Sequence, residues 1–431
     1  MARKRKVLQN NTEGESKRAK FFGDIIHENC VKGEKLQNLI PKLSLDLKSK
    51  VIKQVDKNQS LHQVTKTGNI EIVNEMLAFG VNPNSLNSEG LSPLHIACQK
   101  RYAKVVEELL KNGANPNLKS TNHNKSPLHY VFENEYIDEG SSINKKTISI
   151  IKCLLKYGCE IDAQTDDGES PLYAASLMGN TSAVKVLLKN GAKVTDKNND
   201  SAMHIAAEFG SVEIIEALAN HNIDVNGTGS IPITPLELAA MEGQYAAVRK
   251  LLECGADVNF TGYTDNVSAL HVACEKGNLK IVKELLRFGA KMDFPNSESS
   301  SPILKATIYE HLKIVKELLK HGADVDVINE EGVTALHTAA AHANVAIVKE
   351  LLKYRANVNV KEINGDTALH KAIHGNIYSH YDDTLVVIQL ILEDDSIDLN
   401  SRNEDNLTPL EKAIQMNDFK IGKMIAEKRF E

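Results

Sequence analysis

The sequence predicts an all-α solenoid, in which helix-turn-helix units are stacked and each unit carries a projecting β-hairpin finger. A tetrad such as Ser92-Pro-Leu-His recurs along the chain, and two segments of helical apolar periodicity follow each copy. The first tetrad residue stands at 59, 92, 126, 170, 201, 234, 268, 301, 334, 367 and 408, which makes eleven units with a period near 33. Self-similarity at such a period is the signature of a repeat architecture.

The first segment of each unit begins with residues suited to a helix N-terminus. The first tetrad residue is Ser or Thr in ten of the eleven units, and Pro follows it in six. A Ser or Thr hydroxyl accepts a hydrogen bond from a free amide of the first turn, and Pro at the next position loses nothing by its missing N–H. Small pairs such as Ala206-Ala207 then let neighbouring helices approach closely.

The second segment has one apolar stripe and one charged face. Ile-Val-Lys-Glu-Leu-Leu at 281–286 and 314–319 places apolar pairs four residues apart, which is the pattern of an amphipathic helix. A Gly follows this helix in seven units, and Gly adopts the left-handed conformation of a helix C-terminus without strain. Asn222, Arg355 and Ser396 replace this Gly elsewhere, so we expect less regular fingers there.

An extended piece such as Ala256-Asp-Val-Asn259 and a polar turn complete each unit. One unit alone cannot bury its apolar face, whereas stacked units share a continuous core. The tetrad, the period, the small pair and the terminal Gly together resemble the ankyrin repeat, over residues 59–431. The resemblance implies a curved solenoid whose concave face, made of fingers and first helices, binds protein partners.

The segments outside the regular period have separate predictions. We expect residues 1–20 to be an unstructured basic tail and residues 21–58 to form one or two helices that cap the first repeat. Extra residues near 134–146 and 375–383 fall between the two helices of their units, where surface loops are tolerated.

Catalytic and metal-binding chemistry is not expected. Seven histidines hold the fourth tetrad position, where the resemblance implies that the imidazole ties neighbouring backbone segments together: His62, His95, His129, His204, His271, His337 and His370. The six cysteines show no CxxC pairing or zinc-site spacing. No hydrolase, metalloprotease, phosphate-loop or dinucleotide motif occurs in a supporting context. We therefore expect a protein without a cofactor that is not an enzyme.

Basic residues are concentrated at the N-terminus. Residues 1–20 hold seven Lys or Arg and two Glu, a balance of +5, so the rest of the chain carries −11 against −6 for the whole. Two clusters resemble a bipartite nuclear-import signal read by an import receptor: Arg3, Lys4, Arg5 and Lys6, then Lys17, Arg18 and Lys20. A solvated tail or a loose nucleic-acid patch are the alternatives. Direct DNA binding by the acidic array is disfavoured, because phosphates would repel it.

The N-terminal segment, the apolar stretches and the cysteines predict the cellular compartment. No secretory signal follows the basic residues, and the longest apolar stretches are too short to cross a membrane. Unpaired cysteines suit a reducing compartment. We expect a location in the nucleus, the cytoplasm or both.

Large side chains in units five to nine form a candidate partner-binding set, because aromatic residues are enriched at interface hot spots. The set is Phe209, Met241, Tyr245, Phe260, Tyr263, Glu275, Phe294, Tyr309 and His342. The alternative is that several of them pack between adjacent fingers.

The predicted function is that of a non-enzymatic interaction scaffold or inhibitor. Two alternatives stay open: an adaptor that presents substrates to a ubiquitin ligase, and an effector that a parasite, virus or intracellular bacterium directs against its host. Residues 21–58 match no ligase-recruitment box that we recognise.

Overall fold

The structure is a computed structural model of the chain. It describes residues 2–32, 45–133, 141–193, 202–221, 223–228, 232–262, 267–292, 301–374 and 381–429. Every regular element in these ranges is a helix, which confirms the predicted all-α class. The chain forms two compact units, Met1–Ile205 and Ala206–Glu431, and each is described by itself.

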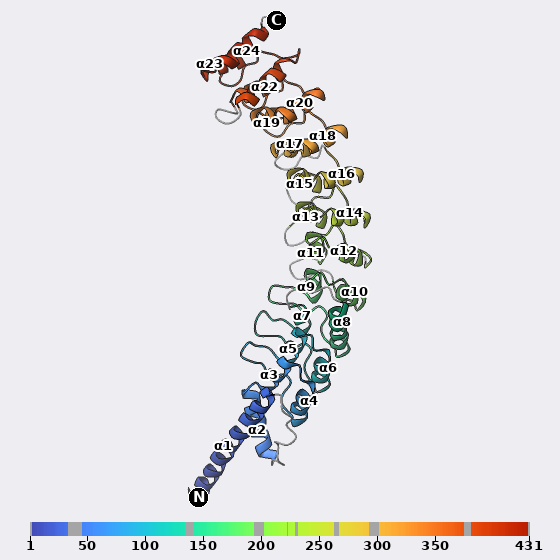
Figure 1. Cartoon of the computed structure of the whole chain (residues 1–431), viewed down its shortest axis with the longest axis vertical. Coiled ribbons are helices and arrows are strands. Elements are labelled where there is room, and N and C mark those ends of the chain that lie inside the picture. Colours follow the sequence, from blue (N-terminus) through green and yellow to red (C-terminus); the bar gives the residue numbers. More distant parts are fainter. Residues whose placement is uncertain are drawn as a thin grey trace. The chain divides into compact units, whose positions relative to one another are not determined.

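Two helices make up each repeat (Figure 1). The first helices are α3 (Ser60–Thr67), α5 (Pro93–Gln99), α7 (Pro127–Tyr130), α9 (Pro171–Leu177), α11 (Ala202–Glu208), α13 (Pro235–Met241), α15 (Ala269–Glu275), α17 (Pro302–Ile308), α19 (Ala335–Ala341), α21 (Ala368–His374) and α23 (Pro409–Gln415). The second helices are α4 (Ile70–Phe79), α6 (Ala103–Lys111), α8 (Ser141–Lys156), α10 (Thr181–Lys189), α12 (Val212–Ala219), α14 (Tyr245–Glu253), α16 (Leu279–Arg287), α18 (Leu312–Lys320), α20 (Val345–Lys353), α22 (Tyr381–Leu392) and α24 (Phe419–Arg429).

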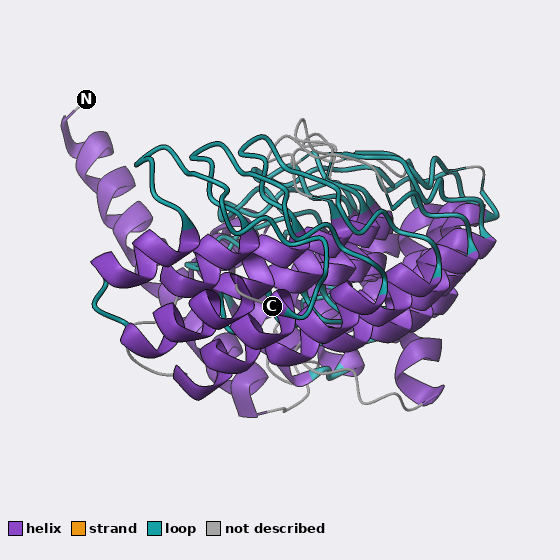
Figure 2. Ribbon diagram, turned by 90° about the horizontal axis from the view of Figure 1, so that it is seen from above, coloured by secondary structure: helices purple, strands orange, loops and turns teal. Residues whose placement is uncertain are grey.

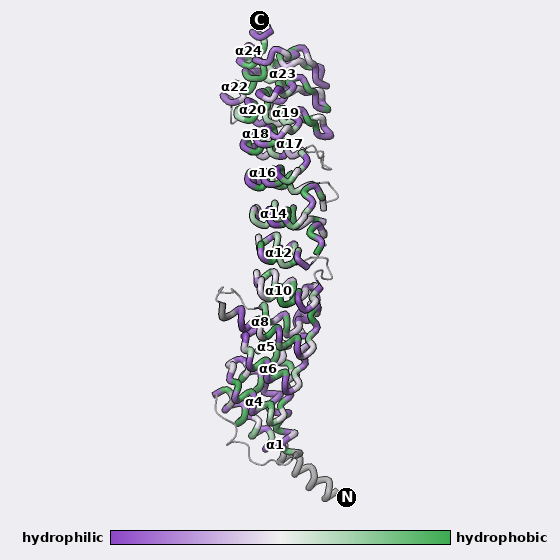
Figure 3. Tube along the Cα trace, turned by 90° about the vertical axis from the view of Figure 1, so that its right-hand side faces the viewer, coloured by the Kyte–Doolittle hydropathy of each residue, from purple (hydrophilic) through white to green (hydrophobic). Residues whose placement is uncertain are grey.

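Within each unit, neighbouring repeats pack on one another through both helix layers. Helix α5 contacts α6 within its repeat and α7 in the next, and α15 contacts α16 and α17 in the same way. Hydrophobic and hydrophilic residues alternate along the helices of both units (Figure 3). The hydrophobic ones form the core, in which Leu94, Leu109, Leu270 and Leu285 are completely buried. Burial of such a side chain contributes about 1.5–3 kcal/mol, so stability is distributed along the stack.

The predicted N-caps begin the first helices. The Thr234 hydroxyl accepts a hydrogen bond from the amide of Glu237 at 3.0 Å, and Ser170 does the same for Tyr173 at 3.1 Å. The Gly residues after the second helices have positive φ, as expected; Gly322, for example, has φ +90°. Arg355 also adopts a left-handed φ of 62°, and its amide donates to the carbonyl of Leu352 at 2.8 Å. The irregular finger expected after Arg355 is therefore wrong, because the backbone keeps the cap conformation despite the side chain. Asn222 lies outside the described residues.

The fingers are tight loops that project from one side of the helices of each unit (Figure 2). One backbone hydrogen bond closes a finger, as from Asn329 N to the carbonyl of Val333 at 3.1 Å. A second joins neighbouring tips, as from Ile363 N to the carbonyl of Glu331 at 2.7 Å. In the described fingers these bonds are too few to form a strand ladder, so the fingers are turns, whereas a β-hairpin was expected.

Helices α1 (Ala2–Lys32) and α2 (Leu45–Lys57) precede the first repeat, and both contact α3. The unstructured tail expected at residues 1–20 differs from the structure, in which this backbone is helical. Ala, Lys, Arg, Gln and Glu all have high helix propensity, and Ala19 and Ile26 of α1 are buried. The loops expected at 134–146 and 375–383 are only partly described: residues 141–146 belong to α8 and residues 381–383 to α22.

Candidate protein-binding surface

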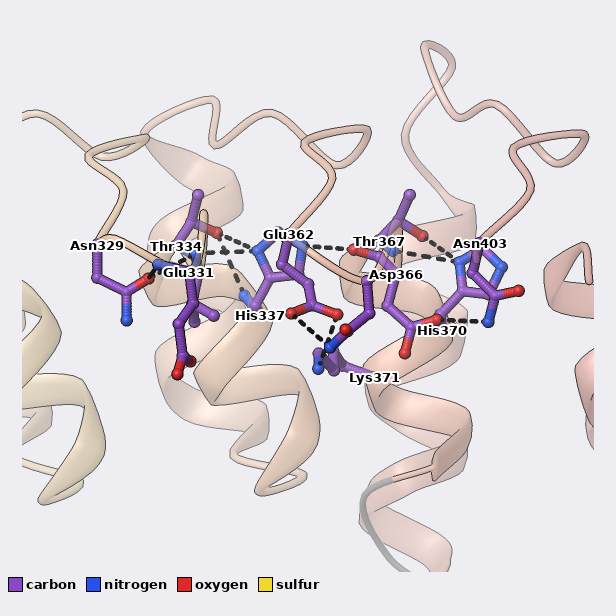
Figure 4. Close-up of polar contacts among 12 residues, drawn as sticks. Asn329, Glu331, Thr334, His337, Glu362, Asp366, Thr367, His370, Lys371 and Asn403 are labelled. Atoms are coloured by element: carbon purple, nitrogen blue, oxygen red, sulfur yellow. Dashed lines mark hydrogen bonds and ion pairs between the residues drawn. The ribbon is translucent and has the colours of Figure 1, made fainter. Parts of the chain in front are cut away.

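Tetrad histidines connect a first helix to the next finger, as His337 and His370 do (Figure 4). The amide of Thr334 donates to Nδ1 of His337 at 3.1 Å, and Nε2 of His337 lies 3.2 Å from the carbonyl of Asp366. Because a backbone N–H can only donate, Nδ1 is the acceptor, and Nε2 therefore carries the proton and donates to that carbonyl. His370 repeats the arrangement with Thr367 and with the carbonyl of Leu407.

The first unit contains the same arrangement. His95 accepts from the amide of Ser92 at 3.0 Å and lies 3.2 Å from the carbonyl of Lys125. His129 accepts from Ser126 and lies 3.1 Å from the carbonyl of Glu169. Burial lowers the pKa of both His95 and His129 to about 4, so both imidazoles are neutral at pH 7. These histidines hold the fingers in place, in agreement with the role that the resemblance implied.

One repeat replaces the histidine by a buried glutamate. Oε2 of Glu237 accepts from the amide of Thr234 at 2.7 Å, and Oε1 accepts from the amide of Gly262 at 3.1 Å. Burial raises the pKa of Glu237 to about 6. The carboxylate thus makes two backbone contacts of the kind that the imidazole makes elsewhere.

With the finger bases held in this way, large side chains remain exposed where the first helices end. We define the helix-end row as the seventh and eighth positions after the first tetrad residue. Five predicted residues belong to it: Phe209, Met241, Glu275, Tyr309 and His342. Phe209 is 56% exposed, Tyr309 is 47% exposed, and Ile308 beside it is 44% exposed. Glu275 and Met241 are half-buried, and His342 with Glu310 lines a hollow of about 330 Å³.

The other predicted residues lie elsewhere. Tyr245 begins α14, a second helix, and its hydroxyl lies 3.5 Å from a carboxylate oxygen of Glu284 on α16. Phe260 lies on a finger and is 42% exposed. Tyr263 and Phe294 lie outside the described residues. The helix-end row is therefore the part of the predicted set that forms a recurring surface in the second unit.

The first unit exposes apolar side chains of the same row, which the sequence reasoning missed. Leu177 and Met178 are 38% and 37% exposed, and with the buried Phe132 they line a hollow of about 180 Å³. An ion pair of Lys125 and Glu133, 2.7 Å apart, lies at its edge. The signal was available in the sequence, because the repeat that begins at Ser92 has the polar Gln99 and Lys100 at these positions.

Two exposed isoleucines of the second unit were also missed. Ile363 is 64% exposed at a fingertip, and Ile328 is 54% exposed just before the turn that Asn329 and Val333 close. A large aliphatic side chain at a turn tip has nothing to bury against within its own finger, which is the signal that could have identified it.

The last fingers surround a polar hollow of about 520 Å³. Nζ of Lys412 lies 2.8 Å from Oδ2 of Asp366, to which Asn403 also donates at 2.8 Å. Burial by itself would raise the pKa of Asp366, but the hydrogen bonds from Lys412 and Asn403 and the charge of Lys412 outweigh it, and the pKa is lowered. Lys371 and Glu362 form a second pair at 3.1 Å (Figure 4). Both pairs join a finger to a first helix.

Family models identify the repeats. The model for ankyrin repeats in three copies matches residues 35–138, 141–229, 193–262, 236–329, 270–362 and 321–382, and the single-repeat model matches residues 364–404. The chain belongs to the ankyrin repeat family. Ankyrin repeats are protein–protein interaction modules, and the family is typically non-enzymatic.

Curated ankyrin proteins match about half of this chain. It is 30% identical over 230 residues to the ankyrin repeat and KH domain-containing protein mask-1 of Caenorhabditis elegans. This alignment covers 52% of this chain and 8% of mask-1. It is 26% identical over 262 residues to human ankyrin repeat and SOCS box protein 16. This alignment covers 57% of this chain and 55% of the human protein. The crystal structure of the human ASB11 ankyrin repeat domain matches 52% of this chain and 97% of that domain, with 30% identity and a TM-score of 0.45. The chain thus spans at most about half the length of these curated relatives.

Over the described ranges, no group of three or more His, Cys, Asp and Glu is placed to hold a metal ion. Among the helices that the structure describes, none combines the length and apolarity needed to cross a membrane.

Proposed function

We propose that this ankyrin repeat protein is a non-enzymatic scaffold or inhibitor that binds a protein partner through the concave face of its array. One observation supports the proposal most directly: the helix-end row exposes large apolar side chains at the same position in three repeats, those that begin at residues 170, 201 and 301. Phe209, Ile308 and Tyr309 occupy it in the second unit, and Leu177 and Met178 occupy it in the first.

These side chains have the character of interface anchors. An aromatic ring that is about half exposed loses its remaining water contact when a partner covers it, and such residues dominate interface energies. Neighbouring polar groups would select the partner. Glu310 follows Tyr309 in the sequence, and His342 of the next repeat lines the same hollow as Glu310. A partner with apolar residues flanked by hydrogen-bond donors fits this surface.

Location in the nucleus and cytoplasm is part of the same proposal. The clusters Arg3–Lys6 and Lys17–Lys20 would serve as the import signal. Residues 1–25 fused to a fluorescent protein are expected to accumulate in the nucleus. A purely cytoplasmic signal would contradict this part of the proposal.

A role as a ubiquitin-ligase adaptor is the second candidate. The observation that favours it is the 26% identity to human ankyrin repeat and SOCS box protein 16. An adaptor would co-purify with ligase subunits, whereas a scaffold or inhibitor would not.

Proximity labelling with the full chain, followed by mass spectrometry, identifies the partner. The variant Phe209→Ala with Tyr309→Ala is then expected to weaken its binding at least tenfold, because each is an exposed aromatic anchor. Tyr354→Ala is the matched control, since Tyr354 ends the second helix α20 and is 37% exposed. Unchanged binding in the double variant, with unchanged melting, would show that the helix-end row is not the contact surface.

A further inference from the structure

The N-terminal helices α1 and α2 form a groove lined by lysines. The hollow between them measures about 410 Å³, and its lining includes Lys17 and Lys20 from α1 and Lys50, Lys53 and Lys57 from α2. Ser16, Ala19 and Gln54 complete the lining, so none of the described residues that line this hollow is an Asp or a Glu. Five lysines thus line one small hollow.

Helix geometry explains why the lysines gather there. Residues three, four and seven apart lie on one face of a helix, so Lys50, Lys53 and Lys57 form one row along α2. Lys17 and Lys20 are three apart and form a second row on α1. Val51 and Val55 lie on a different face of α2 and are completely buried, which holds the lysine row at the surface.

The packing of the two helices holds the rows close together. Gly23 of α1 lies against Gln54 of α2, so closely that a Cβ at this position would lie 2.4 Å from Cγ of Gln54. Asn58, just after α2, donates to Oδ1 of Asp24 of α1 at 3.0 Å. The groove is therefore built by close helix packing, which brings the lysines of the two helices near one another, where they attract an anion.

An exposed aromatic ring lies next to this groove. Phe21 follows Lys17 by one helical turn and is 63% exposed, among the largest exposed fractions of any apolar side chain described here. A basic groove that follows a phosphate backbone, combined with an aromatic ring on which a base stacks, is the general arrangement for binding a single strand of nucleic acid.

We propose that the α1–α2 groove binds single-stranded nucleic acid through its phosphates, with Phe21 stacking on a base. The row from Lys50 to Lys57 spans about 10 Å, which matches a few consecutive nucleotides of one strand. An acidic peptide has no nucleobase to stack on the exposed ring of Phe21, so it fits this combination of lysines and an aromatic ring less well. The acidic remainder of the chain repels a long duplex, and a flexible single strand avoids that repulsion by contacting the cap alone.

Fluorescence anisotropy of the full chain with a labelled single-stranded RNA of mixed sequence tests the proposal. We expect binding at low salt that weakens as salt rises, since each phosphate contact contributes about −0.7 to the slope of log K against log salt. Lys53→Ala with Lys57→Ala should weaken binding about tenfold and reduce this slope by about 1. Phe21→Ala should weaken binding about fivefold or more without changing the slope.

Lys185→Ala with Lys189→Ala is the matched control. These lysines are also exposed and four residues apart, on α10 of the same compact unit, so the net charge changes equally. The control variant should bind as the unchanged chain does. Equal weakening of both double variants would overturn the proposal, because binding would then depend on overall charge and not on the groove.

The same variants distinguish RNA binding from binding of two other anionic ligands and from nuclear import. A poly-glutamate peptide or vesicles of phosphatidylcholine with about one-fifth phosphatidylserine that bind more tightly than RNA, through Lys53 and Lys57, would overturn the nucleic-acid assignment. Lys53 and Lys57 lie outside the import clusters, so their double variant should keep its nuclear accumulation while it loses RNA binding. Failure of RNA binding in the unchanged chain would refute the groove proposal and leave the protein-binding proposal standing.

Discussion

Asp366, at the base of a finger, and Lys412, on the first helix of the next repeat, form an ion pair that is almost completely withdrawn from solvent. Nζ and Oδ2 lie 2.8 Å apart, and the side chains are 10% and 12% exposed. Lys412→Met leaves the buried carboxylate with Asn403 as its remaining partner, so unfolding in urea should show a loss of about 3 kcal/mol. Lys353→Met is the comparison, because Lys353 is 68% exposed and its pair with Glu350 should contribute less than about 1 kcal/mol. Equal losses in the two variants would contradict this account.

Acid should destabilise the first unit through His95 and His129. Their pKa is about 4 in the folded chain, against an ordinary value of 6.5. The neutral imidazoles stabilise the fold fully above pH 6.5, and this contribution is lost as the pH falls toward 4. At about pH 5 each histidine should already lower the free energy of unfolding by about 2 kcal/mol relative to about pH 7, as measured by urea unfolding at these two pH values. His129→Gln cannot titrate, so this variant should lose about 2 kcal/mol less on acidification than the unchanged chain.

Glu237 should have the opposite pH dependence. Its folded pKa of about 6 lies above the ordinary 4.5, so the folded chain binds this proton more tightly than the unfolded chain. The contribution is fully present below 4.5 and is lost as the pH rises through 6. Relative to Glu237→Gln, the unchanged chain should gain about 2 kcal/mol of unfolding free energy between pH 7 and 4.5. A constant difference between the two across this window would show that Glu237 does not titrate with folding.

Arg355→Gly should stabilise the protein. Arg355 holds a left-handed φ of 62°, a conformation that strains a residue with a Cβ but suits Gly. The gain should be up to about 1 kcal/mol in thermal or urea unfolding. Gly322→Ala is the reverse experiment at the equivalent position, where φ is +90° and a Cβ would meet no atom within 4 Å, so a loss there measures backbone strain alone.

The sequence predicted the repeat in detail because its signals are local. The hydroxyl of Thr234 and the terminal Gly322 act within one turn of the residues that they cap, and their neighbours in sequence suffice to interpret them. The charge pattern misled at residues 1–20, which were interpreted as a tail although most of them have high helix propensity and Ala19 is buried. The candidate binding set was partly located: Phe209 and Tyr309 are exposed on one row, whereas Tyr245 lies on a second helix.

The sequence by itself determined the period, the order of helices and the positions that enter the core, because these follow from residue spacing along a helix. The tertiary structure alone decided which large side chains stay uncovered and which charges meet. Lys17 and Lys53 are 36 residues apart in the chain, and Asp366 and Lys412 are 46 apart. Such contacts depend on how helices pack against one another, and no local pattern encodes that distance.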